Sequence, residues 1–174
     1  MKKGLIISVA SFALAAMPIM GVFAADPAAV VDNLTVTVDE ICTFTRTTGN
    51  GNYTNTMAAN AVNNNFGTST FTAVCNAGSG YTVAAVFTAL TGSVSGSIPY
   101  AASATSAGTN RWTAVKGGSS STTYIAASNG TLMDTSGPDT SSGTVQQVSY
   151  KVSTANNIAQ GSYVGTAKYT LTQK

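Results

Sequence analysis

Short runs of alternating apolar and polar residues dominate the chain after residue 24, and signals for helices are nearly absent there. Thr, Val, Tyr and Phe recur in these runs, and Gly, Ser and Asn separate them. Short alternating runs between turn signals are typical of an all-β sandwich or barrel. We expect about eight strands, at residues 33–38, 69–75, 81–90, 97–101, 111–115, 122–127, 145–153 and 162–172.

Two of these runs carry specific expectations about burial. In the first run, Leu34, Val36 and Val38 share one face and polar residues occupy the other, which predicts a half-buried strand. In the run 81–90 both faces are apolar, since Ala84, Val86 and Leu90 oppose the first apolar row. We therefore expect that run to lie centrally and to be covered on both faces.

The first 24 residues are typical of a secretory signal peptide. Lys2 and Lys3 form a positive region, an apolar stretch follows over residues 5–20, and small residues precede Ala25. A permanent membrane anchor is the alternative, because this segment could nearly span a bilayer, but Pro18 and the cleavage pattern argue against it. We expect export to the periplasm, the cell surface or the medium, without a membrane anchor after cleavage.

The expected mature chain, residues 25–174, is long enough for one domain with its own core. Its six basic and six acidic side chains balance. Because the basic residues are scattered singly, nothing in the sequence favours binding of nucleic acid.

Export makes the two cysteines informative. Two thiols in an oxidising compartment are far more often paired than free, so we predict a disulfide between Cys42 and Cys75. Closing a loop of about 33 residues stabilises a fold by roughly 3–4 kcal/mol in the chain-entropy model. A zinc site is the rival interpretation, but the chain has no His and too few ligands.

The side chains available for catalysis are few. The chain has no His, and its acidic residues are Asp26, Asp32, Asp39, Glu40, Asp134 and Asp139. Adjacent carboxylates such as Asp39 and Glu40 point to opposite faces of a strand, and a nucleophilic Ser would lack a base. We predict no enzyme, no cofactor and no metal site. A calcium loop at Asp134 and Asp139 stays open as an alternative to an ordinary solvated turn.

Two features suit a binding module. Trp112, Tyr100 and Tyr124 could form an aromatic platform for glycans, although the setting of Trp112 favours a place in the core. The polar, Asn-rich stretch 47–66 is either an adaptable binding loop or a surface connection, and we favour the connection.

Several short motifs resemble the spore coat U domain family and the related archaic chaperone–usher pilins. A Cys follows an alternating N-terminal run, and a second Cys closes Phe71-Thr72-Ala73-Val74-Cys75. A Gly-rich turn then leads to Tyr81-Thr82-Val83, and the segment from Gly161-Ser162-Tyr163 to Tyr169-Thr170-Leu171 is similar to the closing strand of that group.

The resemblance implies an immunoglobulin-like antiparallel β-sandwich that lacks one strand, which the N-terminal extension of a neighbouring copy supplies. Leu34, Val36 and Val38 would then be the strand donor for assembly. The sequence departs from the pattern in two ways. Only 17 residues of the expected mature chain precede Cys42, so the run 33–38 could be the domain's own strand, and no aromatic residue ends the chain.

The leading hypothesis is a secreted, structural, non-enzymatic protein of the bacterial cell surface, such as a fibre or coat subunit. Its partners would be copies of itself or other surface subunits. The alternative is a secreted binding module for glycans or a cell surface.

Overall fold

The computed structural model describes residues 34–174. The expected signal peptide, together with Asp26, Asp32 and Asn33, lies outside these residues. Within them the protein is all-β and contains no helix, and hence no helix of the length and apolarity that crossing a membrane requires. Eleven strands form three sheets, so the expected number of eight is too low.

The largest sheet has five strands in the order β1-β2-β9-β6-β7. These strands are β1 (Cys42–Thr48), β2 (Asn64–Cys75), β9 (Thr144–Ser153), β6 (Arg111–Lys116) and β7 (Thr123–Tyr124). The second sheet has the order β11-β3-β8, with β11 (Ala167–Gln173), β3 (Tyr81–Phe87) and β8 (Gly130–Asp134). The third is small and comprises β10 (Tyr163–Val164), β4 (Leu90–Gly92) and β5 (Ser97–Ile98). All these strands pair antiparallel.

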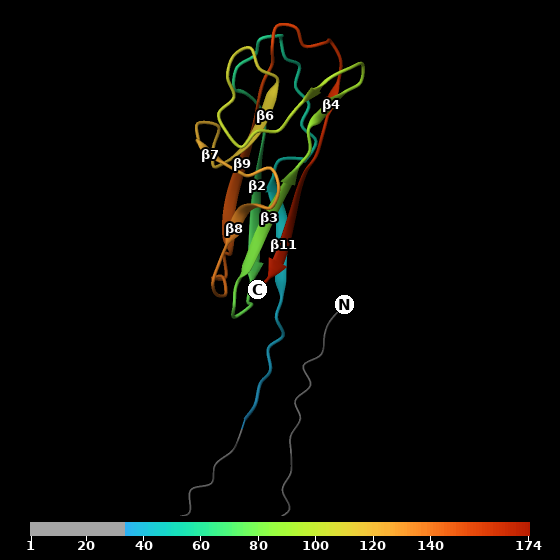
Figure 1. The fold of residues 1–174 in the computed structure, drawn as a ribbon. Coiled ribbons are helices and arrows are strands. Elements are labelled where there is room, and N and C mark those ends of the chain that lie inside the picture. The colour runs from blue at the N-terminus through green and yellow to red at the C-terminus, as the bar shows by residue number, and fades with distance from the viewer. Residues whose placement is uncertain (1–33) are drawn as a thin grey trace, which may run out of the picture. The chain divides into compact units, whose positions relative to one another are not determined.

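The first two sheets face each other in a sandwich-like arrangement, with β3 and β11 in front of β2 and β9 in Figure 1. Aromatic rings from both sheets fill the space between them. Phe71 on β2 lies 4.6 Å from Tyr169 on β11, and Phe87 on β3 lies 5.5 Å from Trp112 on β6, measured between ring centroids. Period-two alternation produces this core, because every second residue of β2 and β3 points inward.

Several sequence-based expectations are confirmed. Trp112 is 2% exposed and therefore belongs to the core, where its indole N–H donates to the carbonyl of Thr88. β3 is the central strand of its sheet, as the run 81–90 predicts.

Other expectations are wrong. β3 is not covered on both faces, because Val86 is 43% exposed, and the run 81–90 breaks after Phe87. Residues 34–40 form no strand, so the strand predicted at residues 33–38 is absent over its described part. The strands β1 and β8 were not expected, and only the first residue of β4 falls in an expected run. The sequence pattern did not predict β1, because most of its side chains are polar or exposed and the alternation of apolar and polar residues is therefore weak.

Candidate assembly site

The residues predicted to act as a strand donor are exposed. Leu34, Val36 and Val38 are 91%, 82% and 74% exposed, and Ile41 is 64% exposed. Isolated exposed apolar residues are common, but four at alternating and near-alternating positions in one unpaired segment are not. The sequence of residues 34–40 thus has the pattern of a half-buried strand, but within the described chain these residues pair with no other strand.

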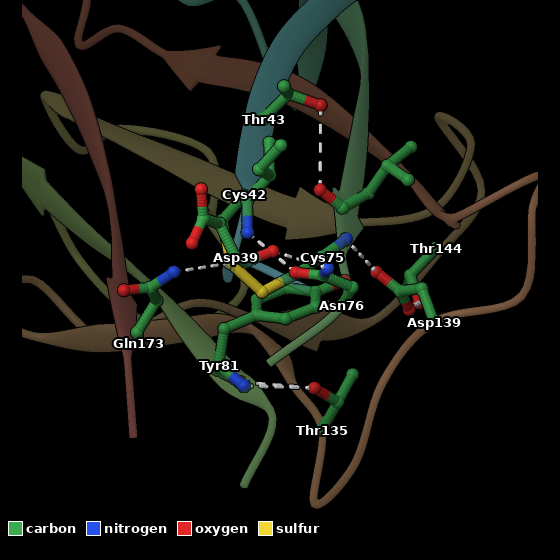
Figure 2. Close-up of a disulfide and its surroundings, with 12 residues drawn as sticks. Asp39, Cys42, Thr43, Cys75, Asn76, Tyr81, Thr135, Asp139, Thr144 and Gln173 are labelled. Atoms are coloured by element: carbon green, nitrogen blue, oxygen red, sulfur yellow. Dashed lines mark hydrogen bonds between the residues drawn. A yellow bond between two sulfur atoms is a disulfide. The ribbon is translucent and has the colours of Figure 1, made fainter. Parts of the chain in front are cut away.

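The end of this segment is fixed to the domain by Asn76, as Figure 2 shows. The Asn76 amide donates to the carbonyl of Asp39 at 2.9 Å and its side-chain oxygen accepts from the Ile41 N–H. The Asn76 backbone N–H donates to the Ile41 carbonyl at 3.1 Å. These bonds define where the segment enters β1.

The predicted disulfide between Cys42 and Cys75 is present and joins the start of β1 to the end of β2 (Figure 2). The two residues are also paired in the register of the sheet. Asp139 supports this end of the sandwich, since one carboxylate oxygen accepts from the Cys75 N–H and the other from the Thr144 hydroxyl. Sequence reasoning missed this role, because Asp139 and Cys75 lie 64 residues apart.

The sandwich is open along one side, between β1 and β11. β1 pairs only with β2, and β11 pairs only with β3, so each is an edge strand of its sheet. The two edges lie side by side in Figure 1, and the Gln173 amide contacts the Cys42 sulfur at 3.1 Å between them. We call this the open side.

Inward-pointing side chains along the open side are only half-buried. On β1 these are Cys42 and Phe44, and on β11 they are Ala167, Tyr169 and Leu171. Each packs against the fully buried core, and Phe44 stacks on Phe71 with centroids 5.4 Å apart. The core of the sandwich is therefore incompletely covered here.

A groove of about 890 Å³ lies where the chain leaves β1 and approaches β11. Residues 51–59 form part of its lining, with residues 158–165 and several apolar side chains, including Phe66 and Leu90. Part of the stretch 47–66 thus lines a groove. Within residues 34–174, no acidic side chain lines this groove.

The carboxylates considered for chemistry do not converge in the described chain. Asp134 is exposed and forms an ion pair with Lys174, whose hydrogen bond holds the pKa of Asp134 below its usual range. Asp139 is engaged by Cys75 and Thr144, and both Asp39 and Glu40 are exposed. Residues 34–174 contain no group of three acidic or thiol side chains placed to hold a metal ion.

The aromatic residues considered as a glycan platform lie in or against the core. Tyr100 stacks on Phe87 at 4.5 Å and meets Trp112 edge-on at 4.8 Å, so two of the three rings pack internally. Tyr124 is half-buried on the edge strand β7. Because Trp112 is buried, the three residues do not form a common exposed surface.

A comparison of the chain with protein-family models, with curated proteins and with solved structures finds no match.

Proposed function

We propose that this protein is an exported, non-enzymatic structural subunit of a bacterial cell surface that assembles by strand addition. The apolar row Leu34, Val36 and Val38 of one copy adds to the open side of the next copy. The observation that carries the proposal is the coexistence of an exposed, unpaired, alternating segment and a sandwich whose core is incompletely covered between two edge strands.

Edge strands offer the hydrogen bonds that strand addition requires. The free side of β11 presents unpaired backbone N–H and C=O groups, and an extended segment can satisfy them. Alternate side chains of that segment would then enter the half-buried row of Tyr169 and Leu171. Full burial of one Leu or Val side chain contributes roughly 1.5–3 kcal/mol, so three such residues supply a substantial part of an interface.

Composition supports a structural role over a catalytic one. The chain has no His, and its carboxylates in the described part are exposed or engaged in local bonds. The expected export and the resemblance to spore coat U and archaic pilin subunits favour the same role. Immunoglobulin-like topology with one missing strand is part of this proposal.

The test uses the expected mature chain, residues 25–174, followed by light scattering and electron microscopy. We expect the wild type to form fibres, and the triple variant Leu34→Ser, Val36→Ser, Val38→Ser to stay monomeric. The matched control Thr35→Ser, Thr37→Ser alters the opposite face of the same segment and is expected to assemble. Emission of the single Trp112 monitors folding. A wild type that stays monomeric, or a triple variant that assembles as well, contradicts the proposal.

The groove supports a second candidate, a secreted binding module for glycans or a cell surface. Tyr53, Asn55 and Tyr163 are among its lining residues, and such side chains suit sugars. A glycan array with the mature chain tests this candidate, and the absence of any bound glycan counts against it.

A further inference from the structure

Charge is distributed unevenly along the expected mature chain. Residues 25–41 contain four acidic side chains and no Lys or Arg, whereas residues 42–174 contain six basic and two acidic side chains. The formal charges of the two parts are therefore −4 and +4. A segment of one sign and a body of the other attract each other between copies, and such complementarity raises association rates.

Acidic residues also flank the apolar row on its own face. In an extended strand, residues at even positions from 32 to 40 would point the same way, which would place Asp32 and Glu40 in line with the row that contains Val36. Asp39 points to the opposite face. As an added strand, the segment would offer another copy an apolar row with a carboxylate at each end.

Arg46 is the matching group on the open side. It is paired with the inward-pointing Phe71 in the register of the sheet, so it follows Cys42 and Phe44 in the inward row of β1. Its guanidinium carbon lies 5.6 Å from the centroid of the Phe71 ring. Among residues 34–174 it forms no ion pair, because Lys174 with Asp134 is the one ion pair of that range, and it donates no hydrogen bond there.

The positive charge of Arg46 acts on two tyrosine hydroxyls of the core. Burial raises the pKa of the Tyr150 and Tyr169 hydroxyls. The positive charge of Arg46 has the opposite, lowering effect on both pKa values. These hydroxyls lie 2.9 Å apart and belong to β9 and to the edge strand β11. Arg46 therefore stands beside the half-exposed core, at the end of the inward row of β1 farthest from the disulfide.

We propose that Arg46 is the ion-pair partner of Glu40 from a second copy, and that this pair sets the direction of the added strand. A strand parallel to β1 aligns its apolar residues with Cys42 and Phe44 and its carboxylate end with Arg46. The reverse direction would bring Asp32 to Arg46. The inference rests on the proposed assembly at the open side, and it adds the specific contact and the orientation.

The experiment is charge reversal in the full mature chain, with the rate of assembly measured by light scattering. Glu40→Lys alone and Arg46→Glu alone each place like charges together, and we expect assembly to slow by about tenfold or more. An equal mixture of the two variants restores unlike pairs in both directions and is expected to assemble at nearly the wild-type rate. The double variant should recover as well. Raising the salt concentration from 0.05 to 0.5 M should slow the wild type, because the Debye length shortens.

Asp39→Lys is the matched control, because it makes the same charge change on the opposite face. It is expected to assemble faster than Glu40→Lys, and mixing it with Arg46→Glu should give no faster assembly than Asp39→Lys alone. The inference is overturned if the single reversals assemble normally, or if the mixture assembles no faster than its components. It is also overturned if Asp32→Lys, and not Glu40→Lys, restores assembly when mixed with Arg46→Glu. A mixture that recovers shows that both variants fold. Failure of the wild type to assemble contradicts the proposed function itself, which keeps the two outcomes apart.

Discussion

Asp139 and Cys75 are joined by two reciprocal hydrogen bonds. The Cys75 N–H donates to the Asp139 carboxylate at 3.1 Å, and the Asp139 N–H donates to the Cys75 carbonyl at 2.8 Å. Since Cys75 is 1% exposed, its N–H has little access to water if the carboxylate is removed. The loop between β8 and β9 is therefore fixed to the disulfide end of the sandwich.

Replacing Asp139 by Ala should destabilise the fold by about 1–3 kcal/mol, because it leaves a buried donor unsatisfied. Urea denaturation followed by Trp112 emission measures this loss. Asp139→Asn retains one acceptor oxygen and should lose less. Asp134→Ala, which removes an exposed carboxylate, should change stability little. Equal losses in Asp134→Ala and Asp139→Ala would contradict the role given to Asp139.

The pair of Tyr150 and Tyr169 predicts a loss of stability in alkali. Burial raises the pKa of both hydroxyls above the value of about 10 that tyrosine has in an unfolded chain. As the pH rises, the unfolded chain releases these protons first. The two hydroxyls therefore make their full contribution to the free energy of unfolding below about pH 10, and this contribution is lost as the pH rises above that value.

Urea denaturation between pH 8 and 11 measures this dependence. The double variant Tyr150→Phe, Tyr169→Phe removes both groups, so its stability should fall less steeply above pH 10. A wild-type stability that is constant up to pH 11 would refute the prediction.

The disulfide predicts a third result. The double variant Cys42→Ser, Cys75→Ser opens a loop with a sequence separation of 33 residues and should lose roughly 3–4 kcal/mol in the chain-entropy model. Wild-type chain kept reduced during denaturation should match this variant. If the reduced wild type were as stable as the oxidised form, the cross-link would have no stabilising role.

Two glycines with similar backbone angles allow the cost of backbone strain to be distinguished from the cost of a steric clash. Gly143 has a φ of 70° and Gly108 has a φ of 73°, so a side chain is disfavoured at both. A Cβ at position 143 would also collide with the carbonyl oxygen of Ala73, whereas the space at Gly108 is open. Gly108→Ala should cost about 1 kcal/mol and Gly143→Ala clearly more, as measured by thermal unfolding. Similar melting temperatures for the two variants would contradict this.

Local information was enough to locate the longer strands β2, β3, β6 and β9. Every second residue is buried in β2 and β3, as alternation predicts, whereas consecutive residues are buried in β6 and β9. The same information misplaced the ends of strands, as the break after Phe87 illustrates. It also overlooked β8, a short strand after the turn at Asn129, whose pairing with β3 depends on a distant partner.

The candidate site divides in the same way. The sequence identified Leu34, Val36 and Val38 as a row, but periodicity does not specify the partner of a strand or whether that partner is in the same chain. The bond between Asp139 and Cys75 and the position of Arg46 beside Phe71 likewise join residues that are remote in sequence.

The sequence by itself determined the β class, the inward place of Trp112 and the pairing of Cys42 with Cys75, since alternation and the presence of only two cysteines are properties of the chain. Only the tertiary structure decided that residues 34–40 remain unpaired and that the edge strands β1 and β11 lie next to each other. The physical reason is that a strand is completed by hydrogen bonds to a neighbour, and the neighbour is selected by the packing of the whole domain.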